Sequence, residues 1–153
     1  MTDESTDVEE KVLAATLVAS LRMQGKYQDC SRGFAKLGRH FGRHMSGKPL
    51  LLLYDSEYRE DDADFEVCMP IRTAKTVAGI EIKELPGGHC VYLMHQGSYE
   101  SIGRSYQKIM QHIQDRHLQH ALPTREVYAK GPGMIFRGNP QKYRTEIQFL
   151  LQK

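Results

Sequence analysis

The chain has 153 residues, of which 40% are hydrophobic and 26% charged, and its formal net charge at pH 7 is +2. This length and balanced composition fit one globular domain rather than a disordered chain. The mild, scattered positive charge gives no sign of a nucleic-acid partner, and the longest apolar runs, residues 12–21 and 50–54, are too short to span a bilayer.

The N-terminal residues 1–10 are acidic and polar, so we expect them to be disordered and to precede a single domain over residues 11–153. No basic region leads into an apolar stretch, as a secretory signal requires, which favours a cytoplasmic protein. The three cysteines, Cys30, Cys68 and Cys90, form no C-x-x-C pair and are expected to be reduced.

The chain contains an internal repeat, with one copy over about residues 11–75 and the other over about 79–153. The segment MQGKY at 23–27 recurs as HQGSY at 95–99. Each segment follows an apolar stretch with strand character and precedes a helical pattern. We read both Gln-Gly pairs as tight strand-to-helix connections, because no phosphate-binding glycine pattern surrounds them.

Helical periodicity follows each of these connections. Apolar residues recur on one face, at Phe34, Leu37, Phe41 and Met45 in the first half and at Ile102, Tyr106 and Ile109 in the second. Ser31 is a candidate N-cap for the first helix, while Gly47 and Pro49 mark its end.

Two strands are predicted after each helix. PLLLLY at 49–54 matches PTREVY at 123–128, and EVCMPI at 66–71 matches EIQFLL at 146–151. A strand–helix–strand–strand unit is too small to cover both faces of its strands. We therefore predict an α+β fold in which the duplicated units form an antiparallel sheet, with two helices on one face and a ligand groove on the other.

Alternation along the strands predicts which side chains face that groove. The apolar sets Val67, Met69, Ile71 and Ile147, Phe149, Leu151 suit the helix side. The predicted groove side carries polar and aromatic residues: Glu66, Cys68, Arg144, Glu146, Gln148, Tyr54, Tyr128, Tyr92 and Met94. The loop at 130–142 would add the apolar side chains of Met134, Ile135 and Phe136.

The segments LPGGHCVYLMHQGSY, PTREVYAKG and KYRTEIQFLLQ, in this order and with the duplication, resemble the GyrI-like small-molecule-binding family. That family provides the effector-binding domain of bacterial AraC-type and multidrug-sensing MerR-type regulators and also occurs as stand-alone proteins. The resemblance covers roughly residues 10–153. It implies a pseudo-twofold fold with a pocket between the repeats, often for bulky, apolar and frequently cationic compounds.

The resemblance also implies a role for Glu146, because an acidic residue of the last strand commonly lies at the pocket floor in this family. Together with Tyr54 and Tyr128, it would neutralise a lipophilic cation and surround it with aromatic rings. Spacing alone favours a solvated Glu146 or one paired with Arg144, and the family resemblance favours the pocket. The second acidic residue of some multidrug sensors is absent, because Ala129 follows Tyr128, and this argues against strong selection for cations.

No metal site or cofactor is predicted. His40 and His44, and likewise His117 and His120, are spaced for one helix face, but no carboxylate or cysteine completes a ligand set. Nor does the sequence contain a G-x-S-x-G nucleophile motif.

The leading hypothesis is a stand-alone, non-catalytic protein that binds a bulky apolar, possibly cationic, ligand for sensing, sequestration or regulation. No direct DNA binding is expected, since only about a dozen residues precede the first predicted strand. One alternative is a hydrolase of reactive alkylating compounds that uses Glu146 with Tyr128 or Tyr54, although this chain lacks the pocket tryptophan of such relatives. The other is an inhibitor of DNA gyrase that acts through protein contact, as the family's namesake does.

Overall fold

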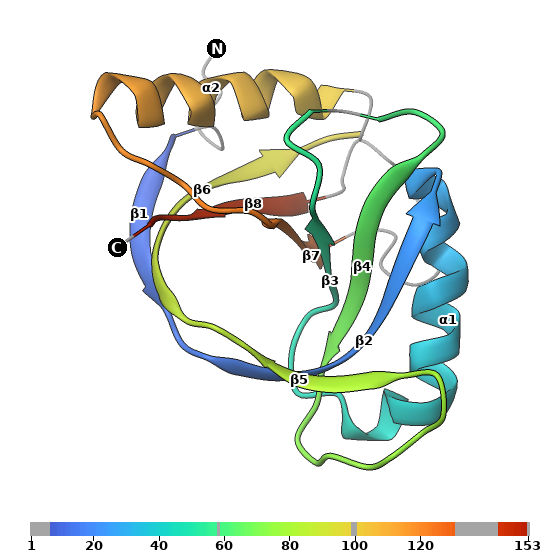
Figure 1. Cartoon of the computed structure of the whole chain (residues 1–153). Helices are drawn as coiled ribbons and strands as arrows, with labels where there is room; N and C mark the ends of the chain where they lie inside the picture. The colour runs from blue at the N-terminus through green and yellow to red at the C-terminus, as the bar shows by residue number, and fades with distance from the viewer. Residues whose placement is uncertain (1–6, 58, 99–100, 131–143, 153) are drawn as a thin grey trace.

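The structure is a computed structural model, and it describes residues 7–57, 59–98, 101–130 and 144–152. Within these ranges, neither α-helix is long and apolar enough to cross a membrane. Figure 1 shows the elements, which are β1 (Glu9–Leu13), β2 (Thr16–Gly25), α1 (Cys30–Phe41), β3 (Leu50–Leu53), β4 (Ala63–Pro70), β5 (Glu81–Leu85), β6 (Gly88–Gln96), α2 (Ile102–Asp115), β7 (Thr124–Lys130) and β8 (Arg144–Leu150).

The duplicated unit predicted from the sequence is present twice, as β2–α1–β3–β4 and as β6–α2–β7–β8. The strand order β6-β8-β7-β3-β4-β2 places the two units symmetrically about the β3–β7 pair. That central pair is antiparallel and joins Leu50 to Val127. The predicted α+β class, with duplicated units in an antiparallel sheet, is confirmed.

The sheet is curled and closes on itself, because each unit pairs with a strand that precedes the other unit in the chain. Strand β1 pairs with β6, and β5 pairs with β2. The face opposite the helices, predicted to be an open groove, is therefore the inside of a curled sheet (Figure 1). The connection from β1 to β2 and the connection from β5 to β6 approach each other closely at Gly87, where an added Cβ would lie 2.3 Å from the Leu13 carbonyl oxygen.

Strand β1 begins within the segment expected to be disordered. Glu9 and Glu10 are the first two residues of this strand. The Tyr92 hydroxyl donates a hydrogen bond to Glu9 over 3.1 Å, and His112 of α2 lies 3.1 Å from Glu10. The domain therefore begins at or before Glu9, and these acidic residues have specific partners.

The boundaries of the first helix differ from the prediction. Helix α1 begins at Cys30, and Asp29 at its N-cap makes no side-chain capping bond. Ser31 lies inside the first turn, where its hydroxyl donates to the Gln28 carbonyl oxygen, so it is not the N-cap. The helix ends at Phe41, and a short turn over Gly42–His44 leaves Met45 outside it.

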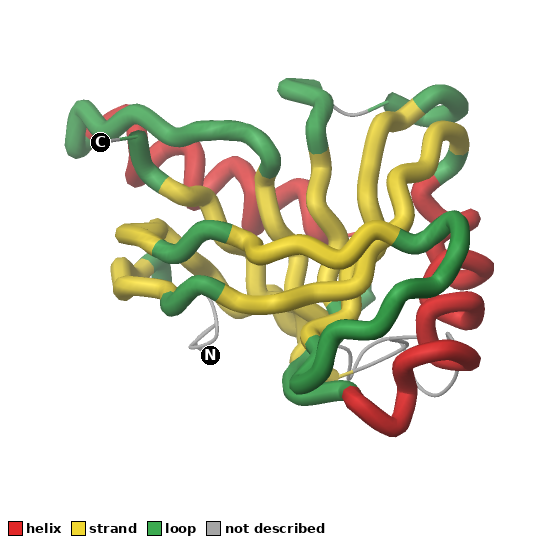
Figure 2. Tube along the Cα trace, turned by 60° about the horizontal axis from the view of Figure 1, so that its bottom comes forward, coloured by secondary structure: helices red, strands yellow, loops and turns green. Residues whose placement is uncertain are grey.

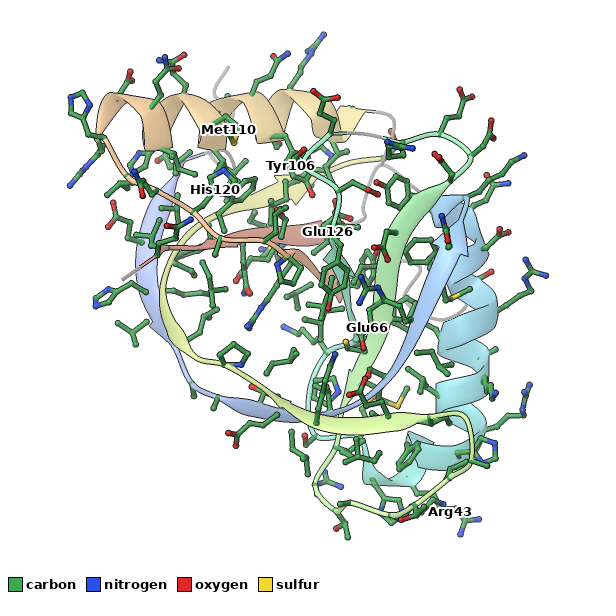
Figure 3. All side chains as sticks on the ribbon, in the orientation of Figure 1. Arg43, Glu66, Tyr106, Met110, His120 and Glu126 are labelled. Carbon is green, nitrogen blue, oxygen red and sulfur yellow. The ribbon has the colours of Figure 1, made fainter. Side chains whose placement is uncertain are left out.

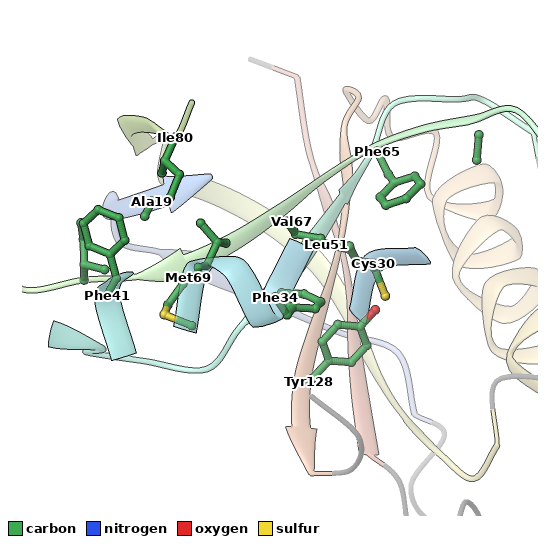
Figure 4. Packing of buried hydrophobic residues seen from close by; sticks show 13 residues of the cluster. Ala19, Cys30, Phe34, Phe41, Leu51, Phe65, Val67, Met69, Ile80 and Tyr128 are labelled. Carbon is green, nitrogen blue, oxygen red and sulfur yellow. The ribbon is translucent and has the colours of Figure 1, made fainter. Parts of the chain in front are cut away.

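The core lies between the helices and the outer face of the sheet, and Figure 2 shows both helices on that outer side. Helix α1 packs on β2 and β4, and α2 packs on β6. Around α1, fully buried Phe34, Leu37 and Phe41 join Val67 and Met69 (Figure 4). Around α2, the cluster comprises Ile109, Ile113, Val91, Leu93, Ile147 and Phe149. The apolar faces predicted for the closing strands therefore point towards the helices.

Candidate ligand-binding residues on the two faces of the sheet

Strand β7 lies near the middle of the sheet, between the strands that carry α1 and those that carry α2. Its outward-facing residue Glu126 pairs laterally with Leu51 and Ile147, which both belong to the core beneath the helices. The Glu126 side chain therefore emerges on the outer face, between the areas that the two helices cover.

Among the described residues, Glu126 has a polar partner but no cationic one. The hydroxyl of Tyr106 on α2 donates a hydrogen bond to its carboxylate, and Figure 3 shows the two residues beneath that helix. No ion pair involves Glu126 within the parts of the chain that the structure describes. Burial raises the pKa of Glu126, and the hydrogen bond from Tyr106 only partly opposes this effect.

Two aromatic pairs lie on the same outer face as this carboxylate. Tyr106 packs edge-on against Phe149 with 6.0 Å between ring centroids, and Tyr128 packs edge-on against Phe34 at 5.8 Å. Burial, followed by the nearby charge of Glu126, raises the pKa of the Cys30 thiol at the start of α1 to about 12. A carboxylate in such surroundings suits a lipophilic cation, because it supplies the counter-charge while the rings supply cation–π contact.

The predicted residue Glu146 lies on the inner face and already has a cation beside it. Lys11 Nζ lies 2.6 Å from its Oε2, and the Gln148 amide donates to the same oxygen over 2.6 Å. The Lys11 ammonium also lies 4.1 Å from the ring centroid of Tyr92. Met94, directly opposite Glu146 across the β6–β8 pair, shares this face. A cationic ligand would have to displace Lys11 here.

Glu66 and Tyr54 form a second compensated group on the inner face. Glu66 is 1% exposed and lies 2.7 Å from Lys83 Nζ, while the Tyr54 hydroxyl donates to it over 2.7 Å. Burial alone would raise the pKa of Glu66, but the bonds from Lys83 and Tyr54 outweigh burial and lower it. The Arg22 guanidinium lies 3.6 Å from the Tyr54 ring centroid. This carboxylate is therefore neutralised within the protein.

The sequence-based prediction that Tyr128 faces the groove together with Tyr54 and Glu146 was wrong. Tyr128 lies on the outer face, buried against Phe34, because Arg125 and Val127 are the β7 residues that point inward. Matching Pro49 and Tyr54 to their counterparts in the second half shifted the alignment by one residue, and a one-residue shift exchanges the two faces of a strand. The same shift hid Glu126 from the sequence analysis.

The remaining predicted lining residues, Met134, Ile135 and Phe136, lie outside the described residues. Where the structure does describe the chain, no three metal-ligating side chains gather into a possible site. His95 lies 2.8 Å from the Ser105 hydroxyl, but both are buried, and the other ring nitrogen faces the Ser98 carbonyl oxygen at 3.0 Å. That pair fixes the connection from β6 to α2 and does not present a nucleophile.

The model of the GyrI-like small molecule binding domain matches residues 6–152, so the chain belongs to that family. The comparison with curated proteins gives no match. Among solved structures, the C-terminal domain of EcmrR is similar with a TM-score of 0.82 and 22% identity, over 96% of this chain and 98% of that one. In the complex of EcmrR with DNA, the similarity covers 57% of the EcmrR chain.

Two further solved structures are similar at lower identity. A hydrolase from Listeria innocua has a TM-score of 0.71 and 11% identity, over 97% of this chain and 93% of that one. SAV2435 bound to tetraphenylphosphonium has a TM-score of 0.65 and 12% identity, over 95% and 94%. At such identities these similarities show the shared fold.

Proposed function

We propose that this GyrI-like domain binds a bulky, apolar, cationic organic ligand on the outer face of its sheet, with Glu126 as the counter-charge. The observation that carries the proposal is a partly buried carboxylate with a hydroxyl partner, a raised pKa and no cationic partner among the described residues. Such a group is poorly compensated in the free protein, so a ligand cation gains more from it than from a carboxylate already paired with lysine. Binding would serve sensing, sequestration or regulation.

The choice of a lipophilic cation has two supports. Four aromatic rings lie on the same outer face as the carboxylate and offer apolar area and negative ring faces, those of Tyr106, Phe149, Phe34 and Tyr128. The similarity to SAV2435, which was solved with tetraphenylphosphonium, supports the same ligand class. The sequence-based proposal that placed the cation at Glu146 is weaker, because Lys11 already neutralises that residue.

Calorimetric titration with tetraphenylphosphonium tests the proposal. The Glu126→Gln variant should bind at least about tenfold more weakly, the equivalent of about 1.4 kcal/mol, because it keeps the shape and loses the charge. Glu146→Gln is the matched control and should bind as the unaltered protein does. Neutral triphenylphosphine oxide should bind weakly to every variant. Equal binding by Glu126→Gln would overturn the proposal, and loss of binding only in Glu146→Gln would move the site to the inner face.

A hydrolase of electrophilic small molecules is a second candidate, and the direct hydrogen bond between Tyr106 and Glu126 favours it over the pairs predicted from the sequence. A glutamate with a raised pKa is suited to general acid–base chemistry near neutral pH. The similarity to the Listeria innocua hydrolase also supports a hydrolytic activity. Incubation with an epoxide, followed by mass spectrometry, should then show a diol whose formation stops in both Glu126→Gln and Tyr106→Phe; recovery of unchanged epoxide from the unaltered protein would exclude this activity towards that probe.

A further inference from the structure

The inside of the curled sheet contains a cavity of about 250 Å³. Its walls are largely apolar and come from both repeat units, with Leu52 from β3, Leu85 from β5 and Leu150 from β8. Leu122 and Pro123 border it from the segment before β7. A water molecule occupies about 30 Å³ in the liquid, so the cavity corresponds to roughly eight waters. This suits a small organic molecule rather than a polycyclic one.

Arg125 of β7 also lines this cavity, and its charge has no counter-charge among the described residues. The residue is 6% exposed, and one of its terminal nitrogens, Nη2, donates to the Pro86 carbonyl oxygen over 2.7 Å. No carboxylate in the described parts of the chain forms an ion pair with it. A guanidinium has five N–H donors in a planar fork that matches a carboxylate, so most of this capacity is uncommitted.

The acidic residues of the inner face are already engaged elsewhere. Glu66 is bound by Lys83 and Tyr54, and Glu146 is bound by Lys11. Lys83 and Tyr54 themselves line the cavity, and Glu84 borders it as a solvent-exposed residue. Among the described residues that line the cavity, Lys83 is therefore neutralised by Glu66, and Arg125 brings a positive charge without a carboxylate partner. The outer-face residue Glu126 provides the opposite charge on the other side of the same strand.

A buried charge without a partner is costly, and an apolar residue would fill the same position more cheaply. Desolvation accordingly lowers the pKa of Arg125. We propose that Arg125 binds the carboxylate of a small apolar monocarboxylic acid inside the curled sheet, with the acid's hydrocarbon part against Leu52, Leu85 and Leu150. This site is separate from the outer-face site at Glu126 and takes a ligand of opposite charge.

Benzoate and hexanoate are suitable probes, because both combine one carboxylate with a small apolar body. Calorimetric titration at neutral pH should show binding of both acids to the full chain. Benzamide, hexanamide and inorganic phosphate should each bind at least about tenfold more weakly, since they lack either the charge or the apolar body. Equal affinity for benzamide would show that the carboxylate charge is not recognised, and equal affinity for phosphate would show that the apolar body is not recognised. Either result would overturn the proposal.

The Arg125→Met variant should lose at least about tenfold in benzoate affinity, while Arg116→Gln, which changes an exposed arginine after α2, should keep it. Unchanged benzoate binding by Arg125→Met would overturn the proposal. Tetraphenylphosphonium binding should be unaffected in Arg125→Met, and benzoate binding should persist in Glu126→Gln, so failure at one site is distinguishable from failure at the other.

A second measurement needs no variant of Arg125 and therefore does not depend on how that variant folds. In the unaltered protein, the guanidinium ¹⁵N–¹H resonance of Arg125 should shift on addition of benzoate and stay in place on addition of benzamide. A resonance that benzoate does not move would overturn the proposal, whatever heat is released in the titration.

Discussion

The buried ion pair between Lys83 and Glu66 gives a quantitative prediction for Lys83→Met. Glu66 is 1% exposed, so removing Lys83 leaves a desolvated carboxylate with the hydroxyls of Tyr54 and Ser20 as its side-chain partners among the described residues. Breaking a buried pair in this way costs about 3–5 kcal/mol. The Lys83 side chain is 28% exposed, so solvent screening reduces the expected loss to about 2–3 kcal/mol.

The corresponding shift of the melting temperature follows from the chain length. At about 2.1 cal/mol/K per residue, 153 residues give an unfolding entropy of about 0.32 kcal/mol/K. A loss of about 2–3 kcal/mol therefore lowers Tm by about 6–9 °C, which calorimetry and circular dichroism both resolve. The double variant Glu66→Gln/Lys83→Met should recover at least about 1 kcal/mol relative to the sum of the single changes, because no unpaired charge remains.

The pH dependence gives a second, independent check on Lys83→Met. The pKa of Glu66 in the folded protein is lowered from 4.5. The ion pair therefore stabilises the fold fully above pH 4.5, and this contribution is lost as the pH falls through the lower folded value. The deficit of Lys83→Met should be largest near pH 7 and shrink in acid. A deficit that is constant with pH, or strictly additive with Glu66→Gln, would refute the interpretation.

Three further predictions concern stability. Because burial raises the pKa of Glu126, the contribution of this residue to the unfolding free energy falls as the pH rises above 4.5; Glu126→Gln should be about 1 kcal/mol more stable at pH 7, with the difference vanishing below pH 4.5 in chemical denaturation. Arg125→Met should raise Tm, because it replaces a buried charge that has no counter-charge among the described residues with an apolar side chain; a fall would argue for an unrecognised partner. Gly33→Ala should lower stability by about 1–3 kcal/mol, because the new Cβ would lie 2.6 Å from Val67 Cγ2, while Gly103→Ala, with open space around it, should not; equal Tm values would contradict this close packing.

The sequence predicted the repeat and the fold class because both depend on local patterns. Apolar periodicity identifies a helix or a strand wherever one face is buried, and Phe34, Leu37 and Phe41 are buried as their spacing predicts. The closing strands were placed correctly for the same reason, since Val67 and Ile147 alternate cleanly with the polar residues Glu66 and Glu146.

The site could not be predicted as well, because its position depends on register and on contacts between distant segments. In β7 the sequence alternates weakly: both Arg125 and Glu126 are polar, so neither residue marks the inner face. The pairing of Lys11 with Glu146 joins residues 135 positions apart, and no local pattern indicates it. Closure of the sheet likewise depends on β1 and β5, two short strands with little apolar alternation.

The adjacent residues Arg125 and Glu126 show what the closed sheet makes possible. Side chains next to each other in a strand point to opposite faces, so these two opposite charges cannot form an ion pair with each other. Arg125 is buried inside the curl, and Glu126 is partly buried beneath Tyr106. A flat, open sheet would leave the Arg125 guanidinium in water. There it would destabilise the fold little, and it would discriminate little between ligands. Because the curl desolvates Arg125, the two sites that we propose on this strand would take ligands of opposite charge.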